Sequence, residues 1–205
     1  MTTIKGSNQT PLHATTLEIP EPNITRFLFS DTRLAPLWTL VRLYVGYEWL
    51  LAGWGKATNP AGVWIGAKAG AAVTGFLTGA LKKTGGDHPD VQGYYGWFVQ
   101  QVALPNEAFL SYVVTFGEIL VGLALILGLF TGVAAFFGGL MNTNYLMAGT
   151  VSSNPVLFVL ATLLVLAWRT SGYWGLDRWV LPRVGVPGAP GPLLKPAQRD
   201  NGARP

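Results

Sequence analysis

The sequence predicts an all-α integral membrane protein, a four-helix bundle with a long outer loop that contains an interfacial or re-entrant helix. Half of the 205 residues are hydrophobic and only 12% are charged, whereas soluble domains carry roughly 25% charged residues. The charged residues are concentrated near the two ends of the chain and in one loop. This uneven distribution is typical of membrane-spanning helices rather than of a soluble core.

Four apolar stretches are predicted to cross the membrane as helices, since about 20 helical residues cross a hydrocarbon core of roughly 30 Å. They run from about residue 34 to 55, 106 to 130, 131 to 151 and 155 to 172. Asn154 and Pro155 favour a helix start there, because asparagine caps helix N-termini and proline is favoured in the first turn. The second and third stretches are nearly continuous, so a very tight turn must join them.

The four spans form one predicted domain, residues 34–182, between a polar N-terminal segment (1–33) and a disordered tail (183–205). Nine lysines and arginines lie near the two ends of the chain, and four (Lys56, Lys68, Lys82 and Lys83) lie in the outer loop of residues 57–105 or directly before it. By the positive-inside rule, this bias predicts a multi-pass protein of the cell membrane with both termini in the cytoplasm. The same distribution accounts for the net charge of +4 without a nucleic-acid partner. The oligomeric state stays open, a homo-oligomer included.

The outer loop carries the predicted interfacial or re-entrant helix at residues 61–83. This segment is rich in glycine and alanine and has Lys68 near its middle. A fifth membrane span is the alternative interpretation. Tyr94, Tyr95 and Trp97 resemble the aromatic belt found at membrane surfaces.

The chain contains no cysteine, and its two histidines, His13 and His88, lie outside the apolar stretches. Disulfides, Fe–S clusters and cysteine-bound zinc are therefore excluded, and so is bis-histidine haem within the membrane. No metal site is predicted. Redox chemistry would need a dissociable carrier or a partner subunit.

Glu118 is the main candidate for a functional residue. It is the only charged residue in the apolar run 109–130. A carboxylate at that depth costs on the order of 2.5–3.5 kcal/mol on insertion scales, and such residues usually have a partner and often a function.

Three of the spans carry polar or small residues at steps of three and four, which places them on one face of each helix. These stripes are Arg42, Gly46, Trp49, Gly53 and Lys56; Ser111, Thr115, Glu118 and Gly122; and Gly138, Asn142, Tyr145 and Gly149. Helix geometry puts Arg42, Glu118 and Asn142 at roughly 12, 14 and 16 Å from the cytoplasmic edge, in one layer. Glu48 and Asn144 fall in a second layer closer to the outer surface, near Tyr145.

Two interpretations of these layers stay open. In the first, Arg42 and Glu118 form a buried ion pair that only fixes the helix register. In the second, the layers form a pocket for a polar head group. Glu118 and Arg42 are then the catalytic candidates, and the candidate quinone or substrate contacts are Asn142, Asn144, Tyr145, Trp49, Glu48 and Lys56. Packing is the alternative role for Trp49 and Tyr145.

Several motifs, in order and spacing, resemble the signatures of the DoxX/DoxD-like membrane proteins. They are Arg42-x3-Gly46-x6-Gly53-x2-Lys56, Gly117-Glu118-x3-Gly122-x5-Gly128, Asn142-Thr-Asn144-Tyr145-x3-Gly149, Ser153-Asn154-Pro155 and Gly175-Leu-Asp177-Arg178. The resemblance implies a four-helix membrane bundle. It also implies a link to quinone, because the founding member of the family is the small membrane subunit of a thiosulfate:quinone oxidoreductase.

Two functions follow as hypotheses. The chain is either a quinone-interacting subunit of a membrane oxidoreductase, with a second redox subunit as partner, or a non-catalytic scaffold that anchors a redox or stress-defence partner in the bilayer. Whether the chain is part of an enzyme therefore stays open. A transporter is a weaker third reading, because no pair of broken helices is visible.

Overall fold

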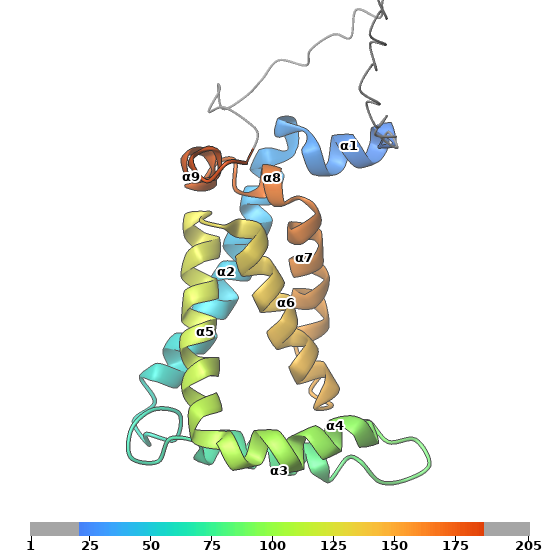
Figure 1. Cartoon of the computed structure of the whole chain (residues 1–205), viewed down its shortest axis with the longest axis vertical. Coiled ribbons are helices and arrows are strands. Elements are labelled where there is room, and N and C mark those ends of the chain that lie inside the picture. Colours follow the sequence, from blue (N-terminus) through green and yellow to red (C-terminus); the bar gives the residue numbers. More distant parts are fainter. Residues whose placement is uncertain (1–20, 187–205) are drawn as a thin grey trace, which may run out of the picture.

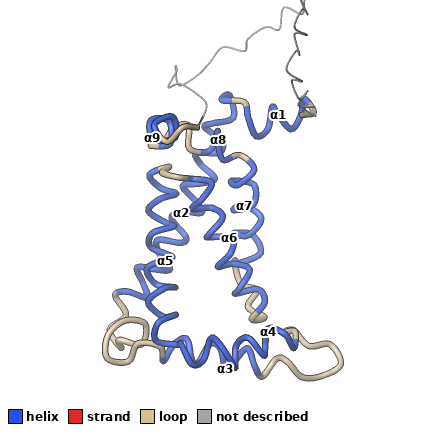
Figure 2. The backbone as a smooth tube through the Cα atoms, in the orientation of Figure 1, coloured by secondary structure: helices blue, strands red, loops and turns tan. Residues whose placement is uncertain are grey.

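The computed structural model describes residues 21–186, which form helices joined by turns and loops (Figure 2). No strand occurs in this part of the chain, so the prediction of an all-α protein is confirmed for it. The first 20 residues of the predicted N-terminal segment, and residues 187–205 of the predicted tail, lie outside the described residues.

Four helices run side by side through the molecule: α2 (Ala35–Ala57), α5 (Glu107–Leu127), α6 (Thr131–Met147) and α7 (Asn154–Leu166). Helix α2 packs along α5, and α6 packs along α7. Helices α5 and α6 lie close together at the turn that joins them and diverge toward the other end of the bundle (Figure 1).

Two glycines bring the backbones of α2 and α5 together. A methyl group on Gly122 would lie 2.5 Å from the backbone nitrogen of Leu50, and one on Gly53 would lie 2.8 Å from that of Ile119. Small residues of this kind allow helices in membrane proteins to approach closely. The contacts also set the register, with Gly53 opposite the turn that carries Glu118.

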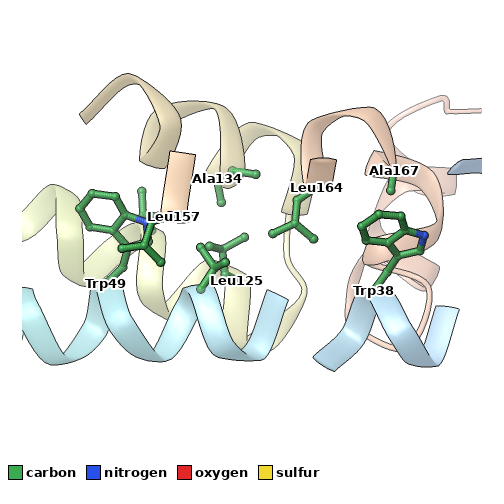
Figure 3. Packing of buried hydrophobic residues seen from close by; sticks show 10 residues of the cluster. Trp38, Trp49, Leu125, Ala134, Leu157, Leu164 and Ala167 are labelled. Atoms are coloured by element: carbon green, nitrogen blue, oxygen red, sulfur yellow. The ribbon is translucent and has the colours of Figure 1, made fainter. Parts of the chain in front are cut away.

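The main apolar core lies along α2, between this helix and α5, α6 and α7. Trp38 and Trp49 mark its two ends, with Leu125 and Leu164 between them (Figure 3). Leu125 and Leu164 are fully buried. The core therefore holds the four helices together along the part of α2 between Trp38 and Trp49.

Two shorter helices, α3 (Ala71–Leu81) and α4 (Gly93–Phe98), lie across the end where α5 and α6 diverge (Figure 1). At about 1.5 Å per residue, the eleven residues of α3 cannot cross a membrane, which argues against the fifth-span alternative. A π-helical turn and a 3-10 turn join α4 to α5. The chain bends there because Pro105 has no backbone N–H to continue the helical hydrogen bonds.

The opposite end carries α1 (Asn23–Ser30), α8 (Trp168–Ser171) and α9 (Asp177–Arg183) (Figure 1). Helices α1 and α9 were not anticipated from the sequence. The indole N–H of Trp38 donates to the carbonyl of Leu28 at 2.8 Å, which ties α1 to the bundle.

One continuous helical stretch among the described residues, Gly93–Leu127, is long and apolar enough to cross a membrane. The bend at Pro105 divides it, and its α5 part rises about 31 Å. Helix α2 is of similar length but carries Arg42, Glu48 and Lys56, and α6 and α7 are shorter.

Candidate functional site

A cavity of about 930 Å³ lies among the diverging helices and the α3–α4 end of the protein. Residues of every helix from α2 to α7 contribute to its wall, which is mostly apolar. The polar side chains on the wall include those of Glu48, Lys56, Glu118, Asn144, Tyr145, Thr150, Ser152, Ser153 and Asn154. The cavity therefore has the general character of a site for a small lipophilic molecule.

Glu118 is 1% exposed and has a partner on each carboxylate oxygen. The ammonium of Lys56 lies 2.5 Å from Oε2, and the hydroxyl of Tyr145 donates to Oε1 at 2.7 Å. We call these three residues the Glu118 triad. They come from α5, α2 and α6 and face the cavity together. All three are candidate site residues, but the sequence did not predict that they would contact one another.

Lys56 is the triad member that connects the site to the surface. It lies in the last turn of α2, and its side chain is 18% exposed. Its ammonium also sits 5.0 Å from the centre of the Trp64 ring. The loop that carries Trp64 is held against α5 because the hydroxyl of Ser111 donates to the Trp64 carbonyl at 2.6 Å.

The ring of Tyr145 is fixed by other aromatic rings. It stacks on Trp49, with ring centres 6.4 Å apart, and meets Phe76 edge-on at 5.9 Å. Trp49 itself is 3% exposed and lines the cavity. Both predicted aromatic residues therefore pack and also contribute to the site.

Arg42 does not contact Glu118, and the predicted layer of Arg42, Glu118 and Asn142 does not form. Its guanidinium instead donates to main-chain carbonyls at the end of α5 and in the C-terminal segment. The acceptors and distances are Leu125 at 2.5 Å, Ile126 at 2.7 Å, Ser171 at 2.9 Å and Trp174 at 3.2 Å. A cation is favoured at this place because the last carbonyls of a helix lack partners within the helix.

The register between α2 and α5 explains the difference. A methyl group on Gly128, just after α5, would lie 2.9 Å from the Arg42 guanidinium, while Gly53 faces Glu118. Helix α2 therefore begins about two turns beyond the end of α5. The depths calculated from the sequence assumed that α2 begins at the level where α5 ends. That assumption placed Arg42 too close to Glu118.

Asp177 completes the same end of the bundle. Its carboxylate accepts from the backbone amides of Phe130, at 2.5 Å, and Thr131, at 2.8 Å. Phe130 stands at the N-cap position of α6 and has no capping side chain of its own, so a distant carboxylate takes that role. We call Arg42 and Asp177 the α5–α6 clamp.

The three other candidates lie apart from the triad's hydrogen bonds. Asn142 is fully buried, and neither of its amide atoms has a partner among the described residues. Asn144 donates within its own helix to the carbonyl of Leu140 at 2.9 Å. Glu48 is half-buried on the cavity wall. Within the described ranges, no three His, Cys, Asp or Glu residues are grouped as metal ligands.

The DoxX family model matches residues 37–148, which is more than half of the chain. The match includes the whole Glu118 triad and Arg42 but ends before Asp177. No curated protein and no solved structure matches the chain. The chain belongs to the DoxX family of membrane proteins.

Proposed function

We propose that this protein is a quinone-interacting subunit of a membrane oxidoreductase, of the thiosulfate:quinone type. The observation that carries the proposal is the Glu118 triad on the wall of a large, mostly apolar cavity. Ionisable groups at such a depth are rare in membrane proteins and mark functional pathways. The volume of about 930 Å³ is within the usual range for small-molecule and cofactor sites.

The proposal includes a membrane topology in which α2, α5, α6 and α7 all cross the bilayer. The outer faces of these helices support it, because they expose large apolar side chains such as Leu40, Phe116, Phe136 and Val159. Exposed arginines, such as Arg169, lie near the α1, α8 and α9 end. By the positive-inside rule, that end faces the cytoplasm and the α3–α4 end faces outward.

The triad suits the head group of a quinone, whose two ring oxygens accept hydrogen bonds. A bound quinone would accept two electrons and two protons. Lys56 gives one ammonium hydrogen to Glu118 and has others to donate to a quinone oxygen. The single hydroxyl hydrogen of Tyr145 is donated to Glu118, so Tyr145 would donate to a quinone oxygen only after leaving Glu118. Glu118 can hold a proton that passes between Lys56 and Tyr145. Lys56, which reaches the surface, can exchange protons with the outer water.

Electron donation is assigned to a partner subunit. The chain has no cysteine, so sulfur from thiosulfate cannot be carried on a thiol of this protein. The dissociable quinone would leave the cavity for the bilayer, and the partner would oxidise the donor.

A non-catalytic scaffold is the second candidate, and the α5–α6 clamp favours it. In the clamp, buried charged groups join helix ends through hydrogen bonds to main-chain groups. If the Glu118 triad has the same purpose, the protein anchors a partner in the membrane and binds no quinone.

Quinone extracted from the detergent-purified protein distinguishes these functions. We expect about one quinone per wild-type chain and much less in Glu118→Gln, because an amide cannot hold the Lys56 ammonium and the Tyr145 hydroxyl as a carboxylate does. The matched control is Glu107→Gln, which changes a residue in the first turn of α5, away from the cavity wall. A thermal melt of each sample verifies folding, and wild type without quinone would favour the scaffold.

A further inference from the structure

Glu48 is the charged group on the cavity wall that the proposed function does not use. It lies in α2, two turns before Lys56, and is half-buried. No hydrogen bond or ion pair joins its side chain to any other described residue, although it lines the same cavity as the triad. A carboxylate in apolar surroundings without a partner is unfavourable, so such a group calls for a ligand or a proton.

The charges on the wall do not balance. Among the described residues, Glu48, Lys56 and Glu118 are the charged side chains that line the cavity. Lys56 is bound to Glu118 at 2.5 Å, which leaves the charge of Glu48 uncompensated. Arg42 cannot neutralise it, because its donors are directed to carbonyls at the α5–α6 clamp. With Glu48 as a carboxylate, the charged side chains of the cavity wall sum to one negative charge.

The rest of the wall favours an organic cation over an inorganic one. Aromatic rings from α2, α3, α4 and α6 surround the space: Trp49, Phe76, Tyr95, Phe98, Phe137 and Tyr145. Aromatic faces attract organic cations and accommodate their apolar groups. Ca²⁺ or Mg²⁺ would instead need about six oxygen ligands, and this wall is mostly apolar.

We propose that the cavity is a binding site for amphipathic organic cations, with the cationic centre at Glu48 and the apolar groups against the aromatic rings. This function is separate from quinone binding, because it depends on Glu48 rather than on the Glu118 triad. Both ligands would occupy parts of one cavity, so a bulky cation is expected to compete with quinone.

Equilibrium dialysis of the purified full-length protein with tetraphenylphosphonium tests the proposal. We expect saturable binding of one cation per wild-type chain and about tenfold weaker binding by Glu48→Gln, which removes the charge and keeps the shape. Asp87→Asn is the control, because it removes an equal charge from an exposed loop. Neutral triphenylphosphine oxide should compete poorly.

Each other outcome overturns the proposal. Absence of saturable binding by wild type would show that the cavity takes no such cation, and equal binding by wild type and Glu48→Gln would show that Glu48 does not recognise it. Glu48→Gln should melt within a few degrees of wild type, because no contact is lost.

Discussion

Arg42→Met is expected to lower the free energy of unfolding by about 3–5 kcal/mol, a loss typical of breaking a buried charged network. The substitution removes the donors that hold the carbonyls of Leu125, Ile126, Ser171 and Trp174. Arg42 is 2% exposed, so water cannot easily replace it, and each buried carbonyl left without a donor costs free energy. Chemical denaturation in detergent, followed by far-UV circular dichroism, measures the effect.

Arg33→Met is the matched control for this prediction. Arg33 is exposed and pairs with Asp31 at 2.6 Å, and exposed ion pairs contribute about 0–1 kcal/mol. A loss at Arg42 no larger than that at Arg33 would contradict a structural role for Arg42. Any Arg42→Met protein that stays folded should keep its quinone, because Arg42 lies away from the triad.

Lys56→Met is expected to destabilise the protein by about 3 kcal/mol and to abolish quinone binding. It leaves the Glu118 carboxylate, which is 1% exposed, with Tyr145 as its remaining hydrogen-bond partner. Removing one partner of a buried ion pair is costly because the other charge is left uncompensated. The same denaturation experiment, with quinone extraction, provides both readouts.

A second substitution separates stability from binding. In Lys56→Met/Glu118→Gln no charge of the triad remains unpaired, so most of the lost stability should return, whereas the quinone should not. Lys82→Met, an exposed lysine, is the neutral control. Recovery of quinone together with stability in the double variant would refute the assignment of Lys56 and Glu118 to the quinone site.

The four long helices could be predicted from the sequence, because each one corresponds to an apolar stretch or to residues that favour a helix start. Helix α5 (Glu107–Leu127) lies within the apolar stretch predicted for it, and α7 begins at Asn154, beside Pro155. Helix α1 was missed although Ile24, Phe27 and Leu28 show helical spacing, because the segment is short and follows several prolines.

The partners of the charged residues were harder to predict. Lys56 and Tyr145 share the faces predicted to point inward, and they meet Glu118. Arg42 shares the face of Lys56 but lies nearly four turns away along α2. The groups that Arg42 contacts therefore depend on how far α2 extends past the end of α5. That offset arises from the packing of Gly53 and Gly122 and from the C-terminal segment, which no local pattern reveals.

Photolabelling with an azidoquinone in proteoliposomes tests the quinone site most directly. The labelled peptides, identified by mass spectrometry, are predicted to come from the cavity walls near Val113–Val121 in α5 and Met141–Tyr145 in α6. The labelling should fall in Glu118→Gln and in Tyr145→Phe, which removes only the hydroxyl. Labelling confined to the outer faces, such as that of Leu40, and equal in all three proteins would contradict a quinone site at the Glu118 triad.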